Sequence, residues 1–302
     1  MDFDQLVTFI EVAKLRNFSR AGQKVFRSQS AVSAQIRQLE HEYGERLLDR
    51  SGKNVSLTAA GEVFLEYAQR FVRLRTESLQ AVASQSDKPR GVLVVGANEA
   101  TCLYVLPEVF GNYSKEYPQV QVSIYRNFSR KILERVEDGT VDLGVVSLPV
   151  KSPNLKVHPI FRDRIMCMVS ARNPLSNKTE VGVRELSEQP LIFPKTGSTR
   201  QLFDSIFRPY RGKLRVAMEI PSVSMIKRFV AADVGVSLVT ASYAADQVRS
   251  GEAKLLALKG LNLYRELGLV HRSDKTLSPA AVAFIELCRQ RAAEQNTGSP
   301  KK

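Results

Sequence analysis

The stretch that decides the N-terminal fold is Ser28-Gln29-Ser30-Ala31-Val32-Ser33-Ala34-Gln35-Ile36-Arg37-Gln38-Leu39-Glu40. It closes a window, residues 12–39, that holds six basic side chains and no Asp or Glu. Phosphates repel carboxylates from any helix that approaches nucleic acid, so this window predicts a DNA-binding surface. Acidic residues return at Glu40, Glu42 and Glu45, where such a helix would leave the groove.

Helical periodicity around this stretch predicts a three-helix unit. Asp2 can cap a first helix, and Asn17-Phe18-Ser19 can cap a second helix over residues 20–26. One stripe of the third helix is apolar, at Val32, Ile36, Leu39 and Tyr43. Gly44 is expected to end this helix, and residues 47–57 are expected to form two short strands around a basic turn, a wing.

The side chains that we expect to reach DNA lie opposite the apolar stripe, in the turn before the third helix and on the wing. They are Arg27, Gln29, Ser30, Ser33, Ala34, Arg37, Arg50 and Lys53. Arg50 and Lys53 are expected to contact phosphates. The alternative, exposed charges on an ordinary turn, predicts little effect of these two residues on affinity.

Thr58 can cap a long helix that runs to about Gln85, roughly 40 Å at ~1.5 Å per residue. A small N-terminal domain cannot bury an apolar stripe of that length, so we expect a second copy of the chain to cover it. The expected dimerisation residues are Leu65, Ala68, Val72, Leu79 and Val82. The alternative is that the helix packs on the C-terminal domain of its own chain.

After a polar linker over residues 84–91, the pattern changes to apolar strands that alternate with helices. Continuous apolar strands with helices between them are typical of an α/β domain whose sheets are covered on both faces. The predicted strands are residues 92–96, 120–125, 141–146, 165–169, 190–193, 214–219, 234–240, 254–258 and 266–270.

Small polar residues follow several of these strands. Ligands of open α/β sheets bind at the carboxyl ends of strands, where helix N-termini offer unpaired N–H groups. The effector-binding residues predicted on this basis are Asn98, Glu99, Ala100, Thr101, Phe128, Ser129, Ser147, Leu148, Thr196, Gly197, Ser198 and Thr199. For Ser198 the alternative is ordinary capping of the following helix. Glu99 would repel an anion unless it pairs with Arg126 or Lys195.

Composition narrows the function classes. The formal net charge is +13, and residues 1–90 hold 14 basic and 11 acidic groups, so most of the excess lies beyond them. The effector portion is therefore expected to bind a small anion, a carboxylate or another oxyanion. Three separated cysteines and three histidines predict no disulfide framework, no metal site, no cofactor and no catalytic histidine pair. No apolar run is long enough to cross a membrane, and we expect a cytoplasmic protein.

An acyl-enzyme interpretation fails on motif order. Ser224-Met225-Ile226-Lys227 matches S-x-x-K and Lys195-Thr196-Gly197 matches K-T-G, but they stand in the reverse of the order that serine β-lactamases use. We therefore expect no enzyme. A solute receptor would explain residues 91–302 and leave the first 60 residues without a role.

The chain resembles the LysR-type transcriptional regulators along essentially its whole length. The matching motifs, in family order and spacing, are Phe18-Ser19-Arg20-Ala21, Ser28-Gln29-Ser30-Ala31-Val32-Ser33, Ile36-Arg37-Gln38-Leu39-Glu40, Gly44, Leu47, Arg50 and Thr58-Ala59-Ala60-Gly61. Two positions depart from the family. Gly22 stands where alanine is usual and should weaken the second helix by ~1 kcal/mol, and Ala34 offers no hydrogen bond to DNA.

The resemblance implies a winged helix-turn-helix domain at residues 1–58, a dimerisation helix at 59–87 and an effector domain at 88–302. The effector domain would be two-lobed and similar to type 2 periplasmic solute-binding proteins. Lobe I would take about residues 88–162 and 267–302, and lobe II about 163–266. An effector between the lobes would regulate transcription by shifting the arrangement of a homodimer or homotetramer on duplex DNA, with RNA polymerase as a further partner of an activator.

Overall fold

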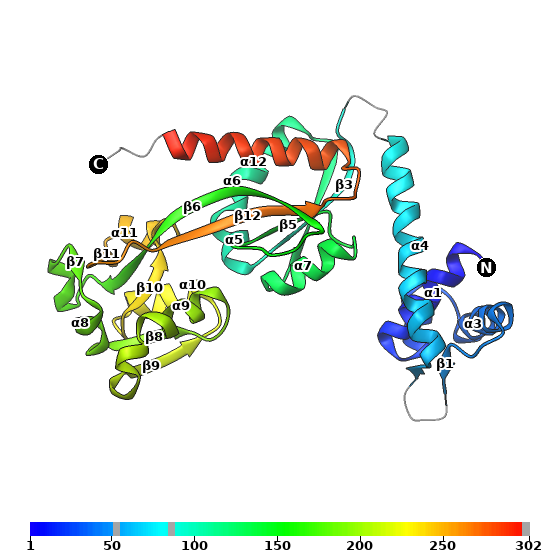
Figure 1. Ribbon diagram of the computed structural model, residues 1–302, viewed down its shortest axis with the longest axis horizontal. Coiled ribbons are helices and arrows are strands. Elements are labelled where there is room, and N and C mark those ends of the chain that lie inside the picture. The colour runs from blue at the N-terminus through cyan, green and yellow to red at the C-terminus, as the bar shows by residue number, and fades with distance from the viewer. Residues whose placement is uncertain (51–54, 84–87, 298–302) are drawn as a thin grey trace. The chain divides into compact units, whose positions relative to one another are not determined.

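The computed structural model describes residues 1–50, 55–83 and 88–297. The chain divides into two compact units, Met1–Ser86 and Asp87–Lys302, which are drawn together in Figure 1. Each unit is described by itself.

The first unit is a winged helix-turn-helix. Its helices are α1 (Phe3–Leu15), α2 (Phe18–Lys24) and α3 (Gln29–Tyr43). As predicted, the Asp2 carboxylate accepts from the Gln5 N–H in a capping box, and the left-handed Gly44 ends α3. The second helix begins two residues earlier than predicted, because Asn17 alone caps it. The wing strands β1 (Leu48–Asp49) and β2 (Ser56–Leu57) pair antiparallel.

The long helix α4 (Ala59–Ala83) packs its first half on this same unit. The Thr58 hydroxyl caps it by accepting from the Gly61 N–H at 3.0 Å. Ala68 is fully buried in the core, and Leu65 and Val72 pack against that core. The prediction that these three residues serve dimerisation is wrong for Ala68, because α1 and α4 form one helix pair that already covers it.

The second unit is built on a mixed sheet in the order β4-β3-β5-β12-β6-β11-β7, with β10 also paired to β6, and a separate parallel pair β8-β9. The strands are β3 (Gly91–Ala97), β4 (Val120–Arg126), β5 (Leu143–Ser147), β6 (Leu155–Ser170), β7 (Glu180–Val181), β8 (Pro190–Pro194), β9 (Arg215–Ile220), β10 (Ser237–Thr240), β11 (Ala253–Leu258) and β12 (Tyr264–Arg272).

Helices cover this sheet on both faces, as expected for the α/β class. The α-helices are α5 (Glu99–Tyr104), α6 (Leu106–Glu116), α7 (Ser129–Glu137), α8 (Val183–Ser187), α9 (Ser198–Ile206), α10 (Val223–Ala231), α11 (Ala245–Arg249) and α12 (Pro279–Thr297). The short 3-10 helices are η1 (Pro174–Asn177), η2 (Arg208–Lys213) and η3 (Ala241–Ala244).

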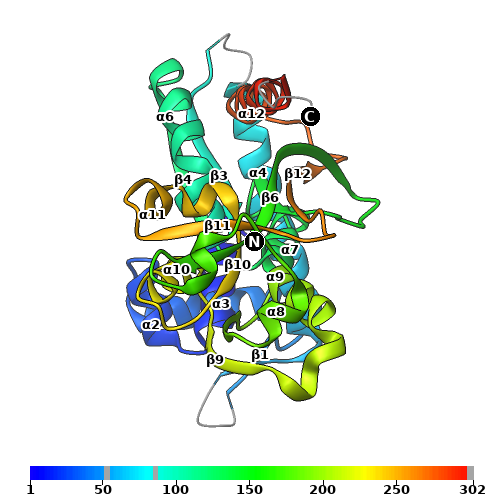
Figure 2. The same ribbon diagram turned by 90° about the vertical axis from the view of Figure 1, so that its left-hand side faces the viewer.

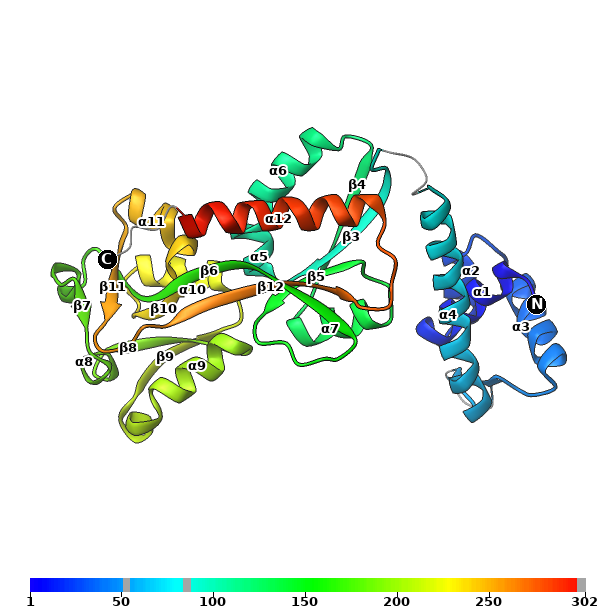
Figure 3. The same ribbon diagram turned by 45° about the horizontal axis from the view of Figure 1, so that its top comes forward.

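Two hydrophobic regions define two lobes within this unit. In lobe I, helices α6 and α12 pack on one side of β3, and α7 packs on the other side with β5. In lobe II, the core gathers around β8, β10 and β11. The long strands β6 and β12 run side by side through both lobes and pair along nearly their whole length (Figure 3). They therefore join the lobes.

The predicted strands are all present, with differences at their ends. The prediction began β6 at Ile165, ten residues late, because residues 155–164 mix charged and apolar side chains and include Pro159. The short edge strand β7 was missed. The strand β10 begins at Ser237 instead of Val234, because Asp233 adopts a left-handed turn conformation with φ of 64°.

Candidate DNA interface and effector site

The recognition helix α3 presents part of the predicted contact set. Gln29, Ser30, Ala34 and Arg37 are exposed. Ser33 is only 7% exposed, and its hydroxyl accepts a hydrogen bond from Arg37 Nη2 at 3.3 Å. Ser33 lies one turn before the buried Ile36 and so faces inward. In place of the exposed contact that was predicted, it positions the Arg37 guanidinium.

Two amide contacts fix α3 on α1. The Thr8 hydroxyl donates to Gln35 Oε1 at 2.8 Å, and Gln5 Nε2 donates to Gln38 Oε1 at 2.9 Å. Thr8 and Gln5 are both buried. The glutamines that flank Arg37 therefore hold the helix in place, which leaves the neighbouring exposed side chains to meet DNA.

The turn before α3 carries two further side chains. Arg27 forms an ion pair with Asp4 at 2.5 Å, so it is held near the start of α1. Phe26 is 97% exposed and has a left-handed backbone with φ of 55°, which is uncommon for a bulky residue. The sequence gave no signal for this exposed aromatic ring, because Phe26 falls in an apolar helical pattern.

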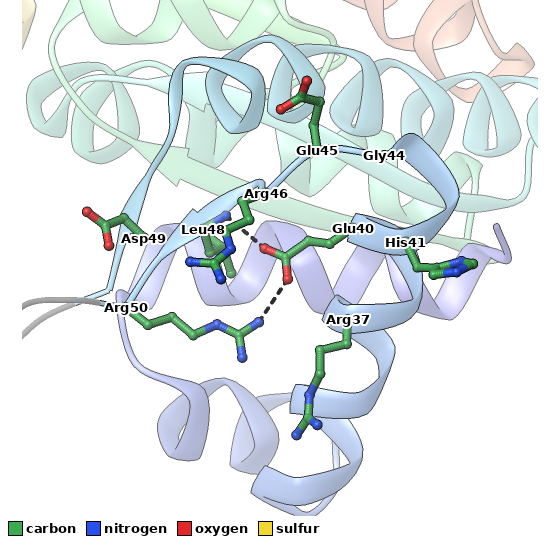
Figure 4. A pocket seen from close by; sticks show the side chains of 9 residues that line it. All are labelled: Arg37, Glu40, His41, Gly44, Glu45, Arg46, Leu48, Asp49 and Arg50. Carbon is green, nitrogen blue, oxygen red and sulfur yellow. Dashed lines mark hydrogen bonds and ion pairs between the residues drawn. The ribbon is translucent and has the colours of Figure 1, made fainter.

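The wing is anchored to α3 by one carboxylate. Glu40 accepts from the N–H groups of Leu47 and Leu48 at 3.1 and 3.2 Å and from Arg50 Nη2 at 3.1 Å. Figure 4 shows Arg50 and Leu48 turned toward this carboxylate across a hollow of about 770 Å³. The hollow is lined by Arg37, Glu40, His41, Gly44, Glu45, Arg46, Leu48, Asp49 and Arg50. Lys53 lies outside the described residues.

In the effector unit, Asn98 and Thr101 organise the start of α5. The Asn98 side chain accepts from the Thr101 N–H at 3.0 Å. Thr101 is fully buried beside Tyr243, yet its hydroxyl forms no hydrogen bond of good geometry with any described residue. Polar groups buried in this way are usually satisfied by a partner, so the hydroxyl indicates room for a ligand atom or a water.

Four predicted hydroxyl residues come together around one arginine that the sequence analysis missed. Arg265, on β12, donates from Nη1 to Ser147 Oγ at 3.2 Å and to Ser198 Oγ at 3.4 Å, and from Nη2 to Thr199 Oγ1. The Ser198 hydroxyl also donates to Ser147 Oγ at 3.4 Å, and the Ser147 N–H donates to Ser129 Oγ at 3.5 Å. The cluster thus joins the end of β5 in lobe I to the start of α9 in lobe II.

The charge of Arg265 is uncompensated within the described residues. It forms no ion pair there, and its Nε is enclosed without a hydrogen-bond partner. Burial lowers the pKa of Arg265, and nearby Tyr243 opposes that shift. Burial in turn raises the pKa of Tyr243 to about 12, so the phenol stays protonated. A partly buried guanidinium with hydroxyl neighbours and no carboxylate fits an anion.

The start of α9 is not an ordinary cap. Gly197 occupies the N-cap position with φ of 89°, and no side chain caps the helix. The alternative for Ser198, that its hydroxyl caps the helix, is therefore wrong. Thr196 and Gly197 are exposed, and Leu148 follows β5 with its N–H donating to the Glu266 carbonyl at 3.0 Å. Phe128 is 67% exposed at the start of α7.

Glu99 is neutralised within its surroundings. Its carboxylate lies 3.9 Å from Arg126 Nη1 and accepts from Ser222 Oγ at 2.6 Å and Ser224 Oγ at 3.4 Å. Of the two partners considered, it takes Arg126. Neighbouring Ala100 packs against the lobe I core. The carboxylate is thus engaged between α5 and α10 and need not repel an anion at Arg265.

The remaining ionisable groups give no reactive centre. Burial raises the pKa of the half-buried Cys102 thiol despite the opposing charge of Arg126, so this thiol is a poor nucleophile. Contrary to expectation, His158 and His271 meet, with 3.2 Å between their Nε2 atoms, because β6 and β12 are paired. Burial lowers the pKa of both histidines. Within the described residues, no group of three or more His, Cys, Asp or Glu could hold a metal, and no helix could span a membrane.

A winged helix-turn-helix with an exposed cationic face, together with a two-lobed unit that has a polar cluster between its lobes, defines a DNA-binding regulator with a ligand-binding domain. Residues 86–293 match the LysR substrate binding domain, and residues 3–62 match the bacterial regulatory helix-turn-helix protein of the lysR family. The chain belongs to the LysR family. It is a sequence-specific DNA-binding transcriptional regulator and not an enzyme.

Relatives with assigned names are regulators of transcription. A probable RuBisCO transcriptional regulator of Chlorokybus atmophyticus is 28% identical over 288 residues, 93% of this chain and 92% of the relative. The transcriptional activator CmpR of Synechocystis sp. is 25% identical over 283 residues, 93% of each chain.

Solved structures share the fold. Full-length OxyR from Pseudomonas aeruginosa has a TM-score of 0.70 at 22% identity and covers 97% of this chain and 94% of its own. CbnR complexed with its target DNA has a TM-score of 0.69 at 23% identity and covers 96% and 100%.

Proposed function

We propose that the effector of this regulator is a small anion, a carboxylate or another oxyanion, held between the lobes at Arg265. The observation that carries the proposal is the guanidinium itself, which is partly buried, has no ion pair among the described residues and has hydroxyls of both lobes on it. An anion with two oxygens can accept two N–H groups of one guanidinium. The hydroxyls of Ser147, Ser198 and Thr199 would donate to the same anion.

The response follows from where these groups sit. Ser147 belongs to lobe I, while Ser198 and Thr199 belong to lobe II. An anion that binds all three favours one arrangement of the lobes over another and shifts the population toward it. The lobe boundary proposed near residues 162 and 267 falls within β6 and β12, the strands that join the lobes.

DNA and a second copy of the chain complete the proposed assembly. Arg27, Gln29, Ser30, Arg37 and Arg50 are the proposed DNA contacts, supported by their positions on α3, in the turn before it and beside the wing. We place the protein in the cytoplasm with its DNA target. As an activator it would also contact RNA polymerase.

The anion proposal is tested by thermal shift of the full chain against small carboxylates, phosphate and sulfate, with matched amides and amines as controls. Ligand at about 100 times Kd adds about 2.7 kcal/mol to the stability of the folded state, which a melting curve resolves. Arg265→Gln should abolish the shift, and Arg265→Lys should retain part of it. Hits confined to amines or neutral molecules, or full response in Arg265→Gln, would show that the effector is not an anion held here.

A further inference from the structure

Lobe II carries an apolar groove that the effector site does not use. It has a volume of about 670 Å³ and lies between α8, α9, η2 and the turn that joins β11 to β12. Its apolar lining includes Leu202, Ile206, Leu261 and Leu263, whose inner sides pack on the lobe II core. Figure 2 shows α8 and α9 close together in this part of the unit, and both pack on η2.

The charge around this groove is of one sign. Arg184 and Lys259 line it and no acidic residue does. Pro209 and Tyr210 also line it, so their neighbours Arg208 and Arg211 stand at its edge.

The acids of the region are already engaged. Asp204 and Glu219 both pair with Arg200, and Glu180 pairs with Lys259. Among the described residues, Arg184, Arg208 and Arg211 have no ion pair at all. They are exposed, and the potential at the groove is therefore positive.

We propose that this groove binds an amphipathic segment of a partner protein in which apolar side chains are flanked by carboxylates. An apolar floor and a cationic rim match such a segment in both hydrophobicity and charge, the pattern of an amphipathic helix in a groove. Nucleic acid would pair with the cations but would leave the apolar floor uncovered. The surface belongs to lobe II alone and does not include Arg265 or the hydroxyl cluster.

The probe is a fluorescein-labelled peptide of about 18 residues, with Leu at helical positions i, i+3, i+4 and i+7 and Glu elsewhere. We expect saturable binding to the full chain, measured by fluorescence anisotropy and weakened by added salt. Arg184→Glu combined with Arg208→Glu should weaken binding about tenfold or more. Ser205→Trp, which places a large ring from an exposed lining residue into the groove, should do the same without a change of charge.

Matched controls separate this site from nonspecific attraction. Arg130→Glu, on the exposed surface of α7, removes a similar charge and should leave binding unchanged. A peptide with Lys in place of Glu, and one with the same composition in scrambled order, should not bind. The proposal is overturned if the Leu/Glu peptide shows no saturable binding, if either control peptide binds equally, or if Ser205→Trp has no effect. Loss of duplex DNA binding in the Arg184/Arg208 double variant, without peptide binding, would instead identify a nucleic-acid surface.

Discussion

Two glycines of the DNA-binding unit are needed for close approach of backbones. A Cβ at Gly61 would lie 1.9 Å from the Leu47 carbonyl oxygen, and a Cβ at Gly22 would lie 2.6 Å from that of Arg27. The sequence analysis counted Gly22 as a weakness of α2. Its glycine instead lets the turn that leads into α3 pack directly on α2.

Gly61→Ala should therefore destabilise the first unit. The added methyl must push α4 away from the start of the wing, which costs about 1–3 kcal/mol of unfolding free energy. Hydrogen exchange of the amides in α4 and β1 measures this locally. Gly111→Ala, at an exposed helical glycine with nothing within 4 Å of the new methyl, is the control and should not destabilise its unit. Unchanged exchange in Gly61→Ala would show that the backbone can yield there.

Sequence alone predicted residues whose role is local. Asp2, Thr58 and Gly44 act on the helix beside them, and each does what its residue type indicates. Arg265 was missed because its role depends on Ser147, Ser198 and Thr199, which lie 66 to 118 residues away in the chain. No periodicity or spacing encodes that meeting.

The helix α4 has two halves that differ in their surroundings. Phe64 and Ala68 in the first half are buried in the core of the first unit. In the second half Leu74, Leu79 and Val82 are 61%, 60% and 74% exposed. Exposed apolar residues on one long helix mark an interaction surface. We therefore keep Leu79 and Val82 as proposed dimerisation residues.

Leu79→Glu combined with Val82→Glu should convert the dimer to monomer. Charges placed in an apolar helix interface are desolvated without partners, so association weakens while each unit keeps its fold. Sedimentation velocity measures the mass of the species. Val63→Glu, at an equally exposed apolar position in the first half, serves as the control. A double variant that sediments as the wild type would place the dimer contacts elsewhere.

At the scale of elements, apolar patterning predicted the strands of the core and failed where a strand crosses between lobes. The first half of β6 carries Lys156, His158 and Arg162 because it is partly exposed along its pairing with β12. A half-exposed strand has no continuous apolar run for the sequence to show. The same exposure brought His158 to His271, a meeting that the sequence did not indicate.

For the whole molecule, DNA affinity should fall linearly with the logarithm of salt concentration. Each phosphate contact releases a counterion, and a dimer doubles the contacts of one chain. Arg37→Ala should weaken binding by about 1–3 kcal/mol if Arg37 reads a base, and should reduce the salt slope by about one per half-site if it contacts a phosphate. Electrophoretic mobility shift at several salt concentrations measures both. An affinity indifferent to salt would contradict a phosphate-based interface.

The pairing of β12 with β5 and β6 also bears on the order in which the protein is made. The lobe I core contains Leu93 and Val95, which leave the ribosome early, but also Leu267, Leu269 and Phe284, which leave among the last. Lobe II is continuous between β6 and β12 and can gather its core first, although its synthesis starts later. The lobe that begins first is therefore completed last, and its unfinished sheet edge at β5 waits through the synthesis of more than a hundred residues.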